Sequence, residues 1–316
     1  SRGLGDVYKR QILRLWAASA DYHADVRCSK EIFKQLSQNY LKFRNTCKFM
    51  LDNLVDFDPE KLTKPEDMPV LDRWLLTKLN ELIEKAEQSY CDYEFHIITH
   101  AVNDFCVTTL SSFYLDIVKD RLYCDGADSL SRRSAQTALY LTLHTLAKLF
   151  APILAFTCDE IWLAMPHTGE DDARNVVLNE MNKPFTAYAL TAEEMANWEK
   201  LADVRTVVNG VLETARAEKK IGKSLEADVH LTVPAEDAFL ANMDGKELAD
   251  LLIVSQVEVT VGEGVKASAE EAAGTKCPRC WMHSESPDEH GLCPRCAAVC
   301  KALGVCLLYT SDAADE

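Results

Sequence analysis

Residues 29–54 read SKEIFKQLSQNYLKFRNTCKFMLDNL, and this stretch decides the fold class. Its apolar residues recur at spacings of three and four, which is the period of one face of an α-helix. They are Leu36, Tyr40, Phe43, Cys47, Met50, Leu51 and Leu54. Ser29 stands just before the pattern and is a residue type that caps helix N-termini. The stretch therefore predicts one long amphipathic helix with one face in a core.

The same period continues along the chain after a loop marked by Pro59 and Pro65. It predicts further helices that are joined by short loops, as in a helix bundle. Their ranges are 71–86, 95–110, 112–123, 131–150 and 153–163. Pro152 separates the last two, because proline removes a backbone donor and clashes with the preceding turn. A later helix is predicted over 192–220.

The period changes to two after residue 220. Apolar and polar residues alternate over 229–233 and again over 257–261, which predicts two β-strands. The residues between them, 235–253, have a helical pattern. Residues 262–274 are rich in Ala, Glu and Gly and predict a linker. The sequence thus places a small α+β unit after the bundle.

Four cysteines follow this unit as Cys277-Pro-Arg-Cys280 and Cys293-Pro-Arg-Cys296, with twelve residues between the pairs. Each C-x-x-C turn can place two thiolates on one metal, and two turns fill the tetrahedral shell of Zn²⁺. No position remains for water, so the pattern predicts one structural zinc site rather than a catalytic one. The alternatives are four unrelated buried thiols or two disulfides, and His283 and His290 are second-choice ligands. The predicted fold class is mainly α, with a helix bundle, a small α+β unit and a C-terminal four-cysteine zinc knuckle.

Composition limits the partners of the chain. The formal net charge is −16, which disfavours a nonspecific nucleic-acid binder but leaves room for local basic patches. The other cysteines are mostly scattered among apolar residues, as is usual in a reducing cytosol, so a cytoplasmic location is expected. The longest apolar stretch, 138–165, contains Lys, Asp, Glu and Pro and is a poor membrane span, so no membrane partner is expected.

Three groups of residues are candidate RNA contacts. One group shares a flank of the first helix, a second lies within eight residues at the end of the 192–220 helix, and a third surrounds the cysteines. They are Lys30, Lys34, Arg44 and Lys48; Arg216, Lys219, Lys220 and Lys223; and Arg279, Trp281 and Arg295. Basic rows can follow a phosphate backbone, and an aromatic ring can stack on an unpaired base. The alternatives are solvated helix faces for the basic residues and packing on the knuckle for Trp281.

Nothing in the chain has the pattern of an active site, so no catalytic residue is assigned. Gly222-Lys223-Ser224 ends like a phosphate-binding loop, but Ala217 occupies the position of the required first glycine. The segment also follows a predicted helix instead of a strand. A nucleotide cradle is therefore rejected here.

Several segments together resemble the isoleucyl-tRNA synthetases of the bacterial type. The resemblance covers about Leu13 to Lys301. The segments that carry it in the first 190 residues are Leu13–Ser19, Phe49–Leu54, Leu71–Trp74, Ser111–Tyr114, Lys119–Tyr123, Ala151–Leu154 and Asp159–Trp162. The bundle resembles the anticodon-binding domain shared with the valine, leucine and methionine enzymes. The junction 220–227, KIGKSLEA, and the four-cysteine module narrow the resemblance to the isoleucine enzyme.

The resemblance implies recognition of the anticodon of isoleucine tRNA, with the zinc module completing it. The family activates isoleucine with ATP through His-Ile-Gly-His and Lys-Met-Ser-Lys-Ser signatures, and neither is found here. We therefore expect a monomeric fragment without the catalytic and editing domains, inactive by itself, with ATP bound only in the absent catalytic domain. The alternatives are a fragment of a valyl or leucyl relative, and a zinc-knuckle protein-interaction module on a helical scaffold.

The expected organisation follows from these patterns. The two ends read like translated adapter or cloning sequence, with native chain ends as the alternative. The segments are a non-native leader 1–11, connecting helices 12–56, the anticodon-binding bundle 57–190, a helix and small α+β junction domain 191–264, a linker 265–275, the zinc module 276–301 and a non-native tail 302–316.

Overall fold

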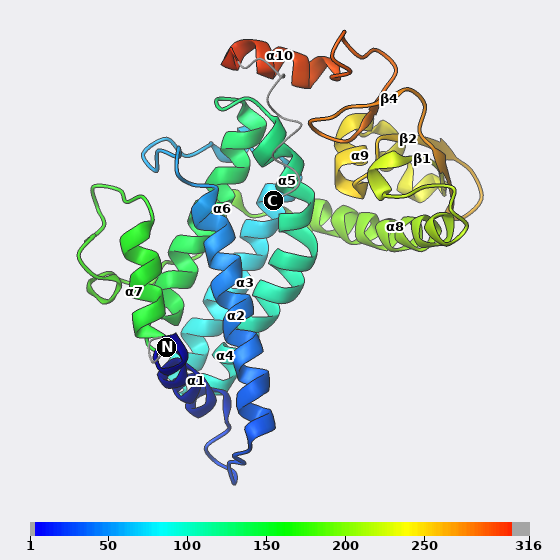
Figure 1. Cartoon of the computed structure of the whole chain (residues 1–316). Helices are drawn as coiled ribbons and strands as arrows, with labels where there is room; N and C mark the ends of the chain where they lie inside the picture. Colours follow the sequence, from blue (N-terminus) through cyan, green and yellow to red (C-terminus); the bar gives the residue numbers. More distant parts are fainter. Residues whose placement is uncertain (1–3, 305–316) are drawn as a thin grey trace. The chain divides into compact units, whose positions relative to one another are not determined.

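The computed structural model of the chain describes residues 4–304, and their side chains from Arg10 onward. The chain divides into two compact units (Figure 1). Of the described residues, unit 1 comprises 4–118 and 128–190, and unit 2 comprises 119–127 and 191–304. The fold is mainly helical, with small sheets in unit 2, as the sequence predicts.

The helices of unit 1 pack against one another as a bundle, in which α3 contacts α6, and α1 contacts both α2 and α4 (Figure 1). The α-helices with residues in unit 1 are α1 (Leu4–Ser19), α2 (Lys30–Asp52), α3 (Val70–Cys91), α4 (Phe95–Asp104), α5 (Leu115–Cys124), α6 (Leu130–Phe150) and α7 (Ala155–Ala164). Short 3₁₀ turns occur at η1 (Pro65–Asp67), η3 (Val176–Leu178) and η4 (Thr186–Tyr188).

Helix α2 confirms the prediction from residues 29–54. The Ser29 side chain caps it by accepting a hydrogen bond from the Ile32 amide. Most of the predicted apolar face is buried, and Met50 is fully enclosed. The C-terminal part of the helix packs on α6 through Phe43 and Phe150, whose ring centroids lie 5.1 Å apart. Burial of this face, at roughly 25 cal/mol per Å² of apolar surface, is what holds the helix to the bundle.

Helix α6 lies in the core of unit 1. Every residue from Ser134 to Phe150 except His144 is buried, so the helix is covered on all sides. This explains the long apolar stretch, because a helix that is apolar all round belongs either in a core or in a membrane. Helix α6 ends before Pro152, and the carbonyls of Pro152 and Ile153 accept hydrogen bonds from the Arg14 guanidinium at 3.2 and 2.8 Å.

The backbone stays helical from Phe95 to Cys124, where the sequence predicted two separate helices. A π-helical segment, η2 (Phe105–Tyr114), joins α4 to α5, and the residues flanking it keep right-handed helical dihedrals. The predicted break near residue 111 is therefore wrong. Consecutive serines weaken a helical pattern in sequence, but here the Ser112 hydroxyl donates to the Val107 carbonyl at 2.8 Å and keeps the helical path.

Unit 2 is built around a three-stranded sheet in the order β2-β1-β3. Strand β1 (Ala227–Val233) pairs in parallel with β2 (Gln256–Val261) and antiparallel with β3 (Lys266–Glu271). Helix α8 (Ala192–Ala217) packs on β3, and α9 (Gly245–Leu252) packs on β2. Alternate residues of β1 are buried, as the predicted alternation requires. A capping box of Thr191 and Glu194 starts α8.

Two segments of unit 2 differ from expectation. Residues 266–271 form β3, where a linker was predicted over 265–275. Its sequence, KASAEE, has only small apolar residues, so an edge strand leaves little signal there. The predicted helix over 235–253 is split into a 3₁₀ segment, η6 (Ala235–Asn242), and α9, because the Asp244 side chain caps a new helix start.

The cysteine-bearing segment completes unit 2 with a two-stranded ribbon and a helix. Strand β4 (Thr275–Lys276) pairs antiparallel with β5 (His283–Ser284), and α10 (Pro294–Leu303) follows. Gly274 has a φ of +94°, and a Cβ there would lie 2.3 Å from the Ser284 carbonyl oxygen. This close approach requires glycine at the entry to the ribbon.

The structure describes different parts of the two segments that were predicted to be non-native. Helix α1 begins at Leu4, inside the stretch predicted as a non-native leader, and continues without a break to Ser19. Of the predicted tail, residues 302–304 finish α10, and residues 305–316 lie outside the described part of the chain. The origin of both ends stays a prediction.

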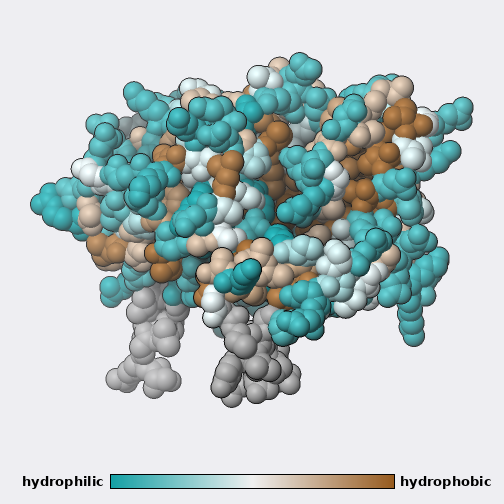
Figure 2. Space-filling model, turned by 90° about the horizontal axis from the view of Figure 1, so that it is seen from above, coloured by the Kyte–Doolittle hydropathy of each residue, from teal (hydrophilic) through white to brown (hydrophobic). Residues whose placement is uncertain are grey.

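Among the described residues, none of the helices combines the length and the hydropathy needed to cross a bilayer. Hydrophilic residues cover most of the face shown in Figure 2, and hydrophobic residues appear between them. Buried apolar side chains instead form the cores of the two units.

Candidate metal centre and nucleic-acid interface

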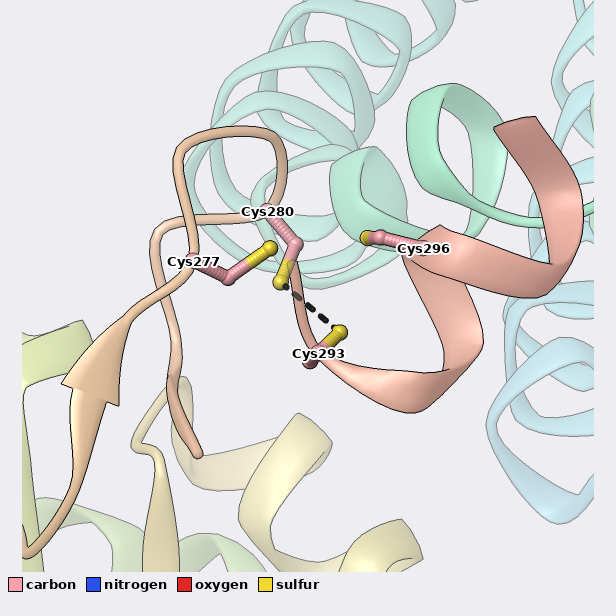
Figure 3. A group of neighbouring side chains, drawn as sticks. All are labelled: Cys277, Cys280, Cys293 and Cys296. Atoms are coloured by element: carbon pink, nitrogen blue, oxygen red, sulfur yellow. Dashed lines mark hydrogen bonds between the residues drawn. The ribbon is translucent and has the colours of Figure 1, made fainter. Parts of the chain in front are cut away.

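The four predicted cysteines come together in unit 2. The Sγ atoms of Cys277, Cys280, Cys293 and Cys296 all lie within 4.8 Å of one another, and they point toward one another (Figure 3). Those of Cys280 and Cys293 are 3.8 Å apart. Tetrahedral thiolates at about 2.3 Å from a zinc ion stand about 3.8 Å from one another. The donor set and its spacing therefore fit a four-coordinate metal ion.

Local backbone structure positions each pair. Cys293 occupies the N-cap position of α10, and Pro294 lies in its first turn, where no amide donor is needed. In the first pair, the Trp281 amide donates to the Cys277 carbonyl at 2.8 Å, which closes the turn. Three of the four thiols are buried, and they pack with Leu292, Cys300 and Cys124 in a small core.

The alternatives to a four-cysteine metal site, which are disulfides and histidine ligands, do not match this geometry. All four cysteines are free thiols, and 3.8 Å is far longer than a disulfide bond of about 2.05 Å. The His283 ring lies 2.9 Å from the Ala272 carbonyl, and the side chain of His290 is 59% exposed. The four cysteines form a group whose ligand atoms lie close enough together to hold a metal ion.

The two arginines of the cysteine module that were predicted as RNA contacts are engaged inside unit 2. Arg295 makes a two-pronged ion pair with Asp120 and also contacts Asp125 at 3.1 Å. Arg279 donates to the carbonyls of Tyr123 and Cys124, and its Nη1 lies 3.6 Å from the Cys296 sulfur. These contacts attach the cysteine module to residues 119–127. In this structure both guanidinium groups therefore hold the module, and neither is free to turn toward a ligand without breaking these bonds.

Trp281 is the exposed aromatic residue of the cysteine module. Its φ is +67°, a left-handed conformation that is costly for a bulky residue and that glycine usually takes. Trp281 is 52% exposed, so packing on the knuckle covers only part of it. The Lys223 ammonium lies 4.8 Å from the ring centroid, a cation–π distance. A strained, exposed aromatic residue with a cation beside it has the chemistry of a base-stacking site.

The basic cluster at the C-terminal end of α8 is only partly free to contact a ligand, because ion pairs occupy two of its residues. Arg216 pairs with Glu213 and donates to the Ser224 hydroxyl, and Lys220 pairs with Glu218 at 2.7 Å. Lys219 ends α8 in a left-handed conformation with φ of +60°. An open cavity here is lined by Arg216, Lys219, Lys220, Ile221, Gly222, Glu226 and Glu271. The cluster thus includes two carboxylates, Glu226 and Glu271, which reduce its net positive charge.

The basic row on α2 lies in unit 1. Positions 30, 34, 44 and 48 fall within about 80° around a helix of 3.6 residues per turn. Lys30, Lys34 and Lys48 are exposed and Arg44 is half-buried, so the row faces solvent as predicted. Lys48 pairs with Asp52 at 2.8 Å. The row keeps the charge needed to follow a phosphate backbone, and its role as an RNA contact stays a prediction.

Sequence reasoning missed Glu226 as part of the site. Its carboxylate accepts from the Gly222 amide at 2.9 Å and the Lys223 amide at 3.2 Å, and it pairs with Lys276 at 2.7 Å. These bonds, the one to Lys276 first, lower the pKa of Glu226 to about 2. The four-residue spacing between Gly222 and Glu226 was visible in the sequence but has no unique meaning without the loop geometry.

A second polar group lies on the exposed face of the sheet. His230 is 3.2 Å from Glu258 on one side and 3.2 Å from Glu270 on the other, with Asp228 at 3.9 Å. The hydrogen bond to Glu270 is the main cause that raises the pKa of His230. These acidic neighbours favour the protonated imidazole, and the ligand atoms of Asp228, His230 and Glu270 also lie within 4.8 Å of one another, so this exposed group could hold a cation.

Comparison with known proteins defines the class. The model of the anticodon-binding domain of tRNA ligase matches residues 72–231, which is half of the chain. The chain therefore belongs to the family of tRNA-ligase anticodon-binding domains.

Three curated relatives of this chain are isoleucine–tRNA ligases. The chain is 44% identical to isoleucine–tRNA ligase of Moorella thermoacetica, over 92% of this chain and 33% of that protein. It is also 44% identical to isoleucine–tRNA ligase of Syntrophotalea carbinolica, with the same coverage. Isoleucine–tRNA ligase of Geobacillus kaustophilus is 42% identical over 95% of this chain and 35% of its own length. The chain thus spans about a third of the length of these relatives.

Proposed function

We propose that this chain is the tRNA-recognition portion of an isoleucine–tRNA ligase. The observation that carries the proposal is Trp281, an exposed aromatic residue in a strained conformation beside the cysteine cluster, in a chain of the anticodon-binding family. Bases of a single-stranded loop are recognised by stacking on aromatic rings and by hydrogen bonds to their edges. The basic row on α2 supports the proposal as a phosphate-contacting face.

The four cysteines would hold one structural zinc ion. Zinc supplies no reaction chemistry in such a site, because four thiolates leave no coordination position for water. Its role is to fix the two C-P-R-C turns and thereby the exposed position of Trp281. We further propose that the chain acts as a monomer in the cytoplasm, as part of a ligase that joins isoleucine to its tRNA.

Anticodon recognition is tested by comparing two tRNAs. We expect the chain to bind isoleucine tRNA about ten-fold more tightly than the same tRNA with a changed anticodon, since one lost base contact costs about 1–3 kcal/mol. Filter binding or fluorescence anisotropy at one fixed salt concentration measures the ratio. A tRNA changed only in its acceptor stem is the matched control and should bind like the original.

Equal binding to the original and the anticodon variant would overturn specific recognition. It would favour the alternative role as a protein-interaction module, which suits the net charge of −16.

The chain by itself should not activate isoleucine. Its 316 residues contain neither the His-Ile-Gly-His nor the Lys-Met-Ser-Lys-Ser sequence. We expect no isoleucine-dependent ATP–pyrophosphate exchange above the protein-free background. Measurable exchange that survives further purification would show a catalytic site in this chain and refute the assignment.

A further inference from the structure

Glu226 joins three parts of unit 2. One carboxylate oxygen accepts the backbone amides of Gly222 and Lys223, and the other pairs with Lys276 of strand β4. Its own carbonyl accepts from the Ala272 amide at 2.8 Å, next to the end of β3. One residue therefore fixes the loop after α8, the sheet and the entry to the cysteine module with respect to one another.

The loop approaches the carboxylate closely. A Cβ on Gly222 would lie 2.8 Å from the Glu226 carboxylate oxygen, so only glycine allows this hydrogen bond without displacing the side chain. Lys219 turns the chain in a left-handed conformation, and its neighbour Lys220 donates from its amide to the Ala215 carbonyl at 2.9 Å. This pattern ends α8 sharply and directs the next residues toward Glu226.

The loop also places the Lys223 side chain beside the Trp281 ring. Lys223 is the residue whose amide Glu226 accepts, and its ammonium lies 4.8 Å from the centroid of the Trp281 ring. Ser255 adds a second tie between the same parts, since its hydroxyl bonds the Leu225 carbonyl and accepts from the His283 amide at 2.7 Å. Lys223 and Trp281 therefore lie together because the junction and the cysteine module are held together.

We propose that Glu226 is a positioning residue for RNA binding, which holds Lys223 beside Trp281 so that the pair contacts a single unpaired nucleotide. This inference rests on the proposed function. Trp281 supplies the ring for the base, and Lys223 supplies a cation for the phosphate of that nucleotide. Glu226 does not touch the RNA. It acts through the backbone of Gly222 and Lys223.

The direction in which Glu226→Ala changes the RNA affinity distinguishes the positioning role from overall electrostatics. Removing an acidic group from a chain of net charge −16 should strengthen binding to a polyanion if only overall electrostatics matters. The proposal instead requires Glu226→Ala to weaken binding, because the freed loop no longer places Lys223. Glu258→Ala is the matched control. It removes the same charge from the exposed sheet face and should leave the affinity unchanged or raise it.

The test is a double-mutant cycle on the full chain with zinc bound, using the anticodon stem-loop of isoleucine tRNA as the RNA. We expect Glu226→Ala and Lys223→Met each to weaken binding about five-fold, and the double variant to bind like Lys223→Met alone, because contacting groups that act as a unit are not additive. Equal zinc content and equal far-ultraviolet circular dichroism for all variants would show that the fold is retained.

The results of this test distinguish the positioning role of Glu226 from the proposed function of the chain. Unchanged or tighter binding by Glu226→Ala overturns the positioning role, and so do effects that multiply in the double variant. If the wild-type chain binds the stem-loop and the Glu226→Ala variant binds it equally well, the proposed function stands and only the positioning role is overturned. Failure of the wild-type chain to bind the stem-loop overturns the proposed function, and the positioning role with it.

Discussion

Replacing Cys280 by serine is expected to release the bound zinc and unfold residues 276–301. The module has two short strands, one helix and a core of few side chains, so little apolar burial is available to hold it. Structural zinc contributes roughly 10–16 kcal/mol of binding free energy in small domains, and that energy is also folding energy. Cys293→Ser removes a ligand from the other pair and should have the same result.

Metal analysis and amide hydrogen exchange measure the two effects together. We expect one zinc ion per wild-type chain and none in either ligand variant, with rapid exchange of the Cys277 and Trp281 amides that are hydrogen-bonded in the intact turn. The far-ultraviolet circular dichroism of the chain should change little, since most helices lie outside the module.

Cys300→Ser is the control for this result. Cys300 is buried in the same small core but is not one of the four clustered thiols. Its replacement should cost about 1 kcal/mol or a little more, for burying a hydroxyl, and should retain the full zinc content. Full zinc in both Cys280→Ser and Cys293→Ser would refute the ligand assignment.

Periodicity and spacing predicted the parts of this molecule that depend on short-range pattern. The α2 face over residues 36–50 could be identified because burial of one helix side imposes a period of 3.6. The cysteine cluster could be identified because each C-x-x-C turn fixes two ligands locally. In both cases the information lies within a few residues of sequence.

The features that were missed depend on partners far along the chain. Strand β3 is defined by its pairing with β1, about 40 residues earlier, and its own side chains are too small to signal a strand. Arg295 looked like a phosphate contact because its partners, Asp120 and Asp125, are 175 and 170 residues away. A basic residue in an acidic chain therefore needs its spatial neighbours before it can be assigned to a ligand.

Asp72→Ala is the second substitution with a large expected effect. Asp72 is fully buried at the start of α3, and its carboxylate accepts hydrogen bonds from the Tyr114 hydroxyl at 2.7 Å and the Ser134 hydroxyl at 2.6 Å. It thus joins α3, the π-helical segment and α6. Its position in the first turn of α3 also places the charge at the positive end of the helix dipole.

Alanine would leave both hydroxyls in the core without this acceptor and would open a small cavity. Each unsatisfied buried polar group costs about 1–3 kcal/mol, so the free energy of unfolding of unit 1 should fall by about 3 kcal/mol or more. Asp72→Asn keeps the shape and one acceptor, and should cost less than half as much. Urea unfolding followed by far-ultraviolet circular dichroism measures these differences.

Glu84→Ala is the matched control, because Glu84 is an exposed acid on the same helix. Its replacement should change the free energy of unfolding by about 0.5 kcal/mol or less. If Asp72→Ala shifted the urea midpoint no more than Glu84→Ala, the buried carboxylate would not be holding the three helical segments together. A large shift confined to Asp72→Ala, with Asp72→Asn between the two, would instead identify hydrogen-bond acceptance by this carboxylate as a main determinant of bundle stability.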